Sequence, residues 1–209
     1  MHLIVTIPAY NEEETIAEVI NSVPKKLKGI KKIETLVWDD GSTDTTAQVA
    51  KKAGATYVFS NKKNLGLART FDLATTKAVK LGADIVVNTD ADNQYDQKEL
   101  SKLLEPILEG KADVVNGNRQ VEVLNHIPPS KKFGNLLGSW VIRKLTGLTI
   151  QDASSGFRAY TAEAIQALHI FSRHTYTHET LVQIALVILL LPKLQFLFIK
   201  EKGVQVILV

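Results

Sequence analysis

Alternation between short apolar runs and helical repeats constrains the fold of this chain more than any other feature. Five runs rich in β-branched residues occur in the first 117 residues, at positions 3–7, 33–38, 56–59, 85–87 and 114–115. The segments between them place apolar residues three and four positions apart, which is the repeat of an amphipathic helix. Three of these repeats are followed by a glycine, where helices commonly end: Gly54, Gly82 and Gly110. The pattern predicts an α/β fold of βαβ units, with a mostly parallel central sheet flanked by helices.

The first helix is expected to start with a capping box. Asn11 is followed three residues later by Glu14, and such a pair satisfies N–H groups at the start of a helix. The apolar stripe of this helix has the spacing i, i+3, i+4, i+7 and comprises Ile16, Val19, Ile20 and Val23.

The composition narrows the possible chemistry. With 209 residues, the chain is long enough for one large domain. It has no cysteine, so disulfides and thiolate chemistry are excluded, and a metal would need oxygen or imidazole ligands. The five histidines lack the spacing of a zinc site and are expected not to be ligands: His2, His126, His169, His174 and His178. No basic segment followed by a long apolar stretch stands at the N-terminus, so we expect a cytoplasmic protein.

Four of the five apolar runs are followed directly by a cluster of polar residues. These clusters read "PAYNEEE", "DDGSTD", "NTDADNQ" and "NGNRQ". In parallel sheets the carboxyl ends of the strands meet at one edge, and ligands bind there. The sequence therefore predicts a binding site at which these four loops converge.

Asp90 and Asp92 place two carboxylates on the same side of an extended segment, because side chains alternate along a strand. Their mutual repulsion is offset if they share a divalent cation. The nearby donors are oxygens, including that of Gln94, and such ligands favour Mg²⁺ or Mn²⁺. The alternative is a solvated turn or a helix cap, since Asp and Asn are common in both.

The loops after the first two runs carry side chains suited to a nucleoside. Asp39 and Asp40 can accept hydrogen bonds from a nucleobase or a ribose, and Gly41 permits a tight turn before the next helix. Tyr10 can stack on a base and Glu12 can bind a ribose hydroxyl. An ordinary turn and a capped helix start are the alternatives at these two places.

The segment after the fifth run is basic and contains another amphipathic repeat. Within 118–145 one acidic residue, Glu122, stands against five basic ones: Arg119, Lys131, Lys132, Arg143 and Lys144. Arg119 presents a fork of donors that suits a phosphate, although a solvated surface arginine is the alternative. The apolar stripe comprises Phe133, Leu136, Leu137, Trp140, Val141 and Leu145.

Six motifs follow one another in order: "VTIPAYNEEETI", "WDDGSTDTT", "NKKNLGLA", "DADNQ", "NGNR" and "QDASSGFRAYTAEA". Together they resemble the motifs of family 2 glycosyltransferases, especially the dolichol-phosphate mannose synthase-like branch, over about residues 1–180. The resemblance implies a Rossmann-like nucleotide-diphospho-sugar transferase fold of the GT-A type. It also implies a catalytic domain over 1–180, with a nucleotide-sugar-binding half at 1–117 and an acceptor-side half at 118–180.

The resemblance also implies roles for individual residues. The nucleotide-sugar is expected to contact Pro8, Tyr10, Glu12, Asp39, Asp40 and Ala91. A metal that bridges the diphosphate is expected at Asp90, Asp92 and Gln94, and the catalytic residues are expected to be Asp90, Asp92 and Arg119. Ser155 and Arg158 are expected to position an acceptor phosphate, together with the basic segment 131–144.

The reaction implied is transfer of a sugar from a nucleotide-sugar, of the GDP-mannose or UDP-glucose type, to a polyprenyl or dolichyl phosphate. Because a lipid phosphate is already an anion, a direct displacement that inverts C1 needs no strong general base. Glu179 lies where relatives with hydroxyl acceptors carry a base, so we do not expect it to be essential. The protein would then work at the cytoplasmic face of the membrane.

Two other functions stay open. One is a family 2 glycosyltransferase with a saccharide or other hydroxyl acceptor. The other is a nucleotide-sugar binder without turnover, since the family's later motifs are not legible in the apolar tail 181–209. The longest apolar run of that tail, 184–191, is too short to span a bilayer.

Overall fold

The structure is a computed structural model that describes residues 1–118, 129–147, 150–172, 174–190 and 204–205. Its strands are β1 (His2–Ala9), β2 (Lys32–Asp39), β3 (Tyr57–Ser60), β4 (Ile85–Asn88), β5 (Val114–Gly117), β6 (Arg158–Thr161) and β7 (Val204–Gln205). Its α-helices are α1 (Ile16–Ser22), α2 (Thr46–Lys52), α3 (Leu67–Lys80), α4 (Leu100–Leu108), α5 (Pro129–Thr146), α6 (Ala162–Ala167) and α7 (Thr177–Leu190). The five strands and four helices predicted for the first 117 residues are confirmed.

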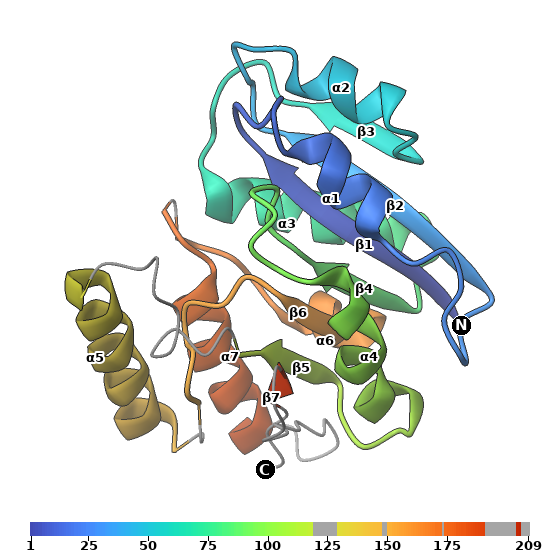
Figure 1. Cartoon of the computed structure of the whole chain (residues 1–209). Helices are drawn as coiled ribbons and strands as arrows, with labels where there is room; N and C mark the ends of the chain where they lie inside the picture. The colour runs from blue at the N-terminus through green and yellow to red at the C-terminus, as the bar shows by residue number, and fades with distance from the viewer. Residues whose placement is uncertain (119–128, 148–149, 173, 191–203, 206–209) are drawn as a thin grey trace.

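The strands form one sheet in the order β3-β2-β1-β4-β6-β5-β7 (Figure 1). β1 pairs in parallel with β2 and β4, and β2 pairs in parallel with β3. β6 lies antiparallel between β4 and β5, so β5 points the same way as β4. The carboxyl ends of β1, β2, β4 and β5 therefore lie at one edge of the sheet, as the sequence predicts, whereas the inserted β6 was not predicted.

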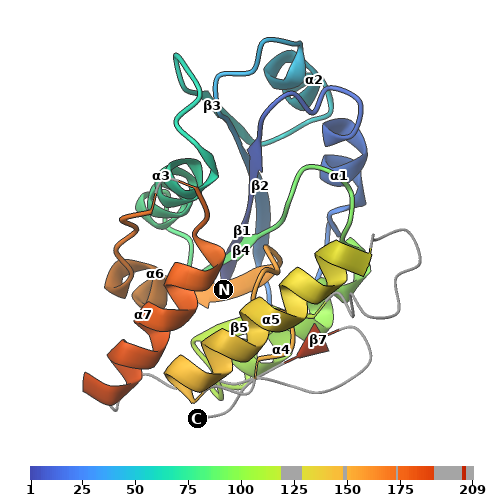
Figure 2. The same ribbon diagram turned by 90° about the vertical axis from the view of Figure 1, so that its left-hand side faces the viewer.

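Helices cover both faces of this sheet (Figure 2). α1, α2 and α4 pack on one face, and α3, α6 and part of α7 pack on the other. Side chains of β1 point alternately to the two faces of the sheet. Leu3 and Val5 pack against the layer of α1, α2 and α4, and Ile4 packs against the layer of α3, α6 and α7. All three side chains are fully buried, and burial of each contributes about 1.5–3 kcal/mol.

The start of α1 differs from the prediction. The helix begins at Ile16 after Thr15, and no side chain caps it, so the predicted capping box is wrong. Instead, the side-chain oxygen Oδ1 of Asn11 accepts the backbone N–H of Thr43 at 2.8 Å. The backbone N–H of Asn11 donates to the Ser42 hydroxyl at 2.9 Å. Asn11 thus ties the loop after β1 to the loop after β2.

α7 continues across residue 180, where the predicted catalytic domain ends. Leu181, Ile184 and Ala185 are buried, so the first part of the predicted tail packs with the core of the domain. Within the described ranges, no helix is both long enough and apolar enough to cross a membrane. Residues 191–203 and 206–209 of the tail lie outside the described residues.

The side chain of Arg158 ties the inserted strand to its neighbours. It is fully buried, and its Nε donates to the side-chain oxygen of Asn116 on β5. Nη1 donates to the Thr177 carbonyl at 2.9 Å and to the Thr180 hydroxyl at 2.7 Å, both on α7. Nη2 donates to the Ala153 carbonyl at 3.0 Å. These bonds satisfy a buried cation that would otherwise be strongly destabilising.

We predict that Arg158→Lys lowers the free energy of unfolding by about 2–4 kcal/mol, because a single ammonium cannot reach acceptors that surround a planar guanidinium. Arg69→Lys is the matched control, since Arg69 pairs with Asp72 at the surface of α3 and such pairs contribute at most about 1 kcal/mol. Urea denaturation followed by circular dichroism measures both. Equal losses in the two variants would contradict the prediction.

Candidate active site

A cavity of about 390 Å³ opens at the carboxyl edge of the sheet, beside the N-terminal end of α3. It is lined by Pro8, Ala9, Tyr10, Glu12, Asp40, Asn64, Gly66, Leu67, Thr70, Asp90, Ala91 and Asp92. These residues come from the end of β1, from the loops after β1, β2, β3 and β4, and from α3, so three of the four predicted loops converge as expected. The N-terminus of a helix attracts anions, because its first N–H groups have no partner within the helix. The cavity therefore offers a favourable place for a negatively charged group.

Asp40 shapes one wall of the cavity. Its Oδ1 accepts from Asn61 Nδ2 at 2.7 Å and from the Leu65 N–H at 2.9 Å. Its Oδ2 accepts from the Gly66 N–H at 2.9 Å, directly before α3. Asp40 therefore holds the loop that leads into α3, in addition to facing the predicted nucleoside site. Asp39 is buried, accepts from the Ser42 N–H at 3.0 Å and does not line the cavity.

Gly41 is required for the close approach of two loops. Its φ is +74°, and a Cβ there would lie 2.6 Å from the backbone carbon of Lys63. The prediction that Gly41 permits a tight turn is thus confirmed.

The loop after β1 also contributes to the lining of the cavity. Tyr10 is about half exposed, so its ring is accessible from the cavity. The backbone N–H of Glu12 donates to the Thr46 hydroxyl at 2.8 Å, and its carboxylate accepts from the Thr15 hydroxyl at 2.7 Å. These two bonds hold Glu12 at the mouth of the cavity.

Asp90 and Asp92 line the same cavity, whereas Gln94 does not. The Asp92 carboxylate accepts the backbone N–H of Gln94 at 3.2 Å, and the side chain of Gln94 is exposed. Two carboxylates on one cavity wall can provide oxygen ligands for Mg²⁺ or Mn²⁺. The contribution of Gln94 to such a site stays a prediction.

Gly156 lies directly behind the Asp90 carboxylate. A Cβ on Gly156 would lie 2.8 Å from Asp90 Oδ2 and closer still to Oδ1, so only glycine leaves room. The Gly156 N–H donates to the Tyr95 hydroxyl at 2.9 Å, and its carbonyl accepts from Asn88 Nδ2 at 3.0 Å. Asn88 also donates to the buried hydroxyl of Tyr176 at 2.8 Å. The Gly156 peptide is therefore held on both sides, and it supports the carboxylate.

The surroundings of Tyr176 keep it neutral. Burial raises the pKa of the Tyr176 hydroxyl well above its usual value, and the negative charge of Asp90 raises that pKa further. The ring of Tyr176 stacks on Phe71 of α3, with ring centroids 3.8 Å apart. This stack joins the polar network under Asp90 to the helix whose N-terminus faces the cavity.

The predicted acceptor residues are placed differently from what was expected. Ser155 and Arg158 are both fully buried and neither lines the cavity. The Ser155 hydroxyl accepts the Phe157 N–H at 3.3 Å, and the Arg158 guanidinium is bonded to protein atoms as described above. As placed, neither side chain is accessible to an acceptor phosphate. Arg119 lies outside the described residues.

Sequence reasoning missed Thr70 and Gly156. Thr70 lines the cavity, and its buried hydroxyl has no hydrogen-bond partner among the described residues. A threonine within a helical repeat gives no sequence signal for such a position. Gly156 stands between Ser155 and Arg158 in "SSGFR". A glycine often marks a place where another group approaches the backbone closely, so its presence in this motif was a signal that could have been used.

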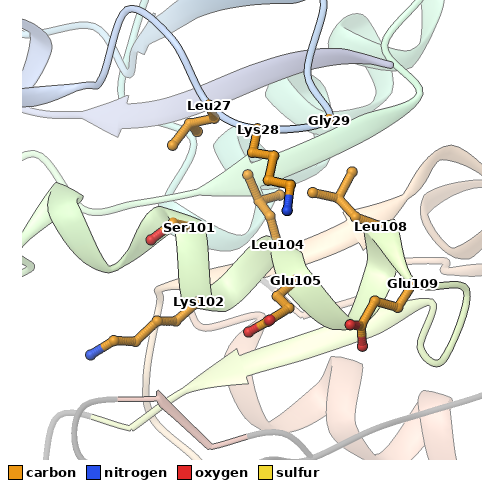
Figure 3. Close-up of a pocket in the computed structure, with 9 residues that line it drawn as sticks. All are labelled: Leu27, Lys28, Gly29, Ser101, Lys102, Leu104, Glu105, Leu108 and Glu109. Atoms are coloured by element: carbon orange, nitrogen blue, oxygen red, sulfur yellow. The ribbon is translucent and has the colours of Figure 1, made fainter.

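A second cavity, of about 410 Å³, lies between α4 and the loop that precedes β2 (Figure 3). Leu104 and Leu108 of α4 face Leu27 across it, and Lys28, Glu105 and other charged side chains stand around it. No residue predicted for the site lines this cavity.

Comparison of the sequence with known protein families identifies the family of the chain. The model of the glycosyl transferase family 2 matches residues 4–168. The chain belongs to this family.

Named relatives of this glycosyltransferase come from archaea and bacteria. The UDP-N-acetylglucosamine–dolichyl-phosphate N-acetylglucosaminyltransferase of Methanococcus voltae is 30% identical over 180 residues, covering 78% of this chain and 70% of that protein. The dolichyl-phosphate hexose transferase of Haloferax volcanii is 30% identical over 186 residues, covering 88% and 77%. The undecaprenyl-phosphate mannosyltransferase of Micrococcus luteus is 30% identical over 181 residues, covering 81% and 70%.

A solved structure confirms the fold. Glucosyl-3-phosphoglycerate synthase from Mycobacterium tuberculosis, crystallised with Mn²⁺, UDP and glucosyl-3-phosphoglycerate, superposes with a TM-score of 0.68 at 22% identity. The match covers 91% of this chain, which spans 66% of that structure's length. The predicted GT-A type of α/β fold is thereby confirmed.

We predict that Gly156→Ala weakens the binding of Mn²⁺ with a nucleoside diphosphate by about 10- to 100-fold, because the added methyl displaces the Asp90 carboxylate. Gly134→Ala is the matched control, since a Cβ at that position on α5 meets no atom within 4 Å. Calorimetric titration compares the two variants with the wild type. Unchanged binding in folded Gly156→Ala would show that the carboxylate position does not depend on this contact.

We also predict that Thr70→Val weakens nucleotide binding by about 2- to 10-fold, which is the effect of one lost hydrogen bond. Stability should not fall, because valine keeps the shape and removes a buried hydroxyl that lacks a partner in the described structure. Thr75→Val is the control and should lower stability without weakening nucleotide binding. The Thr75 hydroxyl donates to the Phe71 carbonyl at 2.8 Å on the same helix, and Thr75 does not line the cavity. Titration and thermal unfolding separate these effects.

Proposed function

We propose that the protein is a metal-dependent, inverting glycosyltransferase that moves a sugar from a nucleotide-sugar to a polyprenyl or dolichyl phosphate. The observation that carries this proposal is the position of Asp90 and Asp92 in one cavity with Tyr10, Glu12 and Asp40. The first pair suits the diphosphate end of a nucleotide-sugar, and the other three suit its nucleoside end. The start of α3 beside them favours the negative charge of the diphosphate.

The residues present fit a divalent metal. Asp90 and Asp92 supply the oxygen ligands that Mg²⁺ and Mn²⁺ prefer. Within the described part of the chain, no cluster of three or more His, Cys, Asp or Glu side chains could hold a metal ion by itself. Ligation by two carboxylates leaves positions for diphosphate oxygens, as is usual for Mg²⁺ in phosphate chemistry. A bound metal would stabilise the negative charge that develops on the leaving diphosphate.

The names of the relatives support the lipid phosphate as the acceptor. Three of them are transferases named for dolichyl or undecaprenyl phosphate. Glu179 supports the same assignment, because its two carboxylate oxygens accept the backbone N–H groups of Phe171 at 2.8 Å and Ser172 at 3.0 Å. A carboxylate that holds a loop in this way is poorly placed to serve as the base that a hydroxyl acceptor requires. An acceptor that is already an anion needs no such base, and it would bring the enzyme to the cytoplasmic face of the membrane.

Binding of the donor is tested by calorimetric titration of GDP, UDP and their sugars, with Mn²⁺ and with EDTA. We expect one nucleotide to bind only with the metal, and Asp92→Asn to weaken that binding at least about tenfold. Asp96→Asn is the matched control, because Asp96 lies in the same loop but caps the turn at Lys98 rather than lining the cavity. Binding that is insensitive to EDTA would refute the metal-dependent site.

Transfer is tested with the nucleotide-sugar that binds and three acceptors in detergent: a polyprenyl phosphate, the corresponding polyprenol, and a soluble saccharide. We expect a glycolipid product with the polyprenyl phosphate alone. A product with hydroxyl acceptors would support the saccharide-transferase alternative. Donor binding without any product would support the nucleotide-sugar binder.

A further inference from the structure

The helix α5 presents its apolar side outward. Phe133, Trp140 and Leu145 are 68%, 50% and 71% exposed, respectively. Leu136, Leu137 and Val141 are exposed as well, so the apolar stripe seen in the sequence forms one open face along the helix. A helix at the surface of a globular protein normally turns such a stripe toward the core. We call this surface the outer face of α5.

The inner face of α5 is engaged with the protein through Ile142, which is buried in a cluster with Leu181 and Ala185 of α7, and through polar side chains. Ser139 is fully buried, and its hydroxyl accepts the Ala153 N–H at 3.0 Å. Asn135 donates to the Asp152 carboxylate at 2.9 Å and to the Ser154 hydroxyl at 2.6 Å. The helix is therefore held by hydrogen bonds on its inner side, and its exposed apolar side is not a result of loose packing against the core.

The charge of α5 selects among the possible partners of the outer face. The helix contains four basic residues, Lys131, Lys132, Arg143 and Lys144, and no acidic residue. Lys144 is exposed beside Leu145, whereas Arg143 donates to the Ile150 carbonyl at 2.6 Å on the inner side. An apolar face with Trp, Phe and Leu, on a helix that has basic but no acidic residues, is the composition of helices that lie in the interface of an anionic bilayer.

We propose that the outer face of α5 docks on an anionic lipid bilayer surface, with the helix axis in the plane of the membrane. At 18 residues the helix is about 27 Å long, so the contact involves the whole helix and not one side chain.

Docking in this way has a consequence for the active site, and this part rests on the proposed function. Asn135 and Ser139 bind residues 152–154, and Gly156 behind Asp90 follows two residues later. The same helix thus contacts the bilayer on one side and the support of the donor site on the other. A phosphate carried by a membrane lipid would arrive next to the site without the chain having to cross the bilayer.

The first test uses the two tryptophans of the chain, Trp38 and Trp140. Trp38 lies on β2 against Phe59 and Trp140 lies on the outer face of α5, so Trp38→Phe leaves a reporter on α5 and Trp140→Phe leaves one in the sheet. Each variant is mixed with vesicles of brominated phosphatidylcholine and about one third phosphatidylglycerol, without nucleotide or metal. We expect quenching in Trp38→Phe and none in Trp140→Phe. Equal quenching in both, or none in either, would overturn the proposal.

The second test measures vesicle sedimentation of variants at exposed positions. We expect Leu137→Ser combined with Trp140→Ser to weaken binding at least about tenfold, and Lys144→Glu at least about fivefold. Lys80→Glu on α3 is the charge-matched control and should bind like the wild type. Binding by the double serine variant at wild-type affinity would overturn the proposal.

Two alternative partners of the outer face, a second copy of the chain and residues 191–209, predict different experimental results. If the face joined two copies of the chain, sedimentation equilibrium without vesicles would show a dimer that the double serine variant loses. If residues 191–209 covered it, deleting them would create vesicle binding that the full chain lacks. Either result would overturn docking by the full chain. Failure of vesicle binding with intact transfer in detergent would refute only this proposal, whereas vesicle binding without donor binding would refute only the proposed function.

Discussion

The close approach of the Asp90 carboxylate to Gly156, which leaves no room for a Cβ, joins two parts of the chain on which the candidate site depends. Asp90 lies just after β4, and Gly156 precedes β6, about 65 residues later in the chain. Asn88 and Tyr95 hold the peptide of that glycine from both sides. The site at the sheet edge is thus complete only when β6 has paired with β4. A donor site that sequence places in the first 117 residues therefore depends physically on residues beyond them.

Most of the fold could be predicted because its signals are local. Apolar runs and helical repeats report burial residue by residue, and the glycines after α2, α3 and α4 have the positive φ expected of helix ends. β6 was missed because its insertion between β4 and β5 is a long-range choice that four residues do not encode. The direction of the α5 stripe was also unreadable, since hydrophobic periodicity tells which residues share a face and not what that face contacts.

The candidate site could be predicted at positions where the residue type itself indicates a ligand, such as carboxylates for a metal and an aromatic ring for a base. The loops with Asp40 and with Asp90 and Asp92 do line one cavity, together with Tyr10 and Glu12. The roles of buried groups could not be predicted in this way. An arginine within a motif suggests a phosphate contact, whereas the Arg158 guanidinium is buried and donates to protein acceptors. The sequence does not tell whether nearby carbonyls will satisfy a guanidinium in this way.

The placement of β6 also has a consequence for the order in which the sheet can be assembled. Strands β1 to β4 all lie within residues 2–88 and are linked by pairing to one another. They can therefore associate as soon as that part of the chain has been synthesised. β5 has no partner among them and reaches the sheet through β6, whose residues come about forty positions later. During synthesis, β5 can therefore join these strands only after residue 161 has left the ribosome. Pairing of β6 joins β5 to the sheet and positions Gly156 behind Asp90 at the same moment, before β7 can pair with β5. The candidate site is thus complete before the edge strand of the sheet is added.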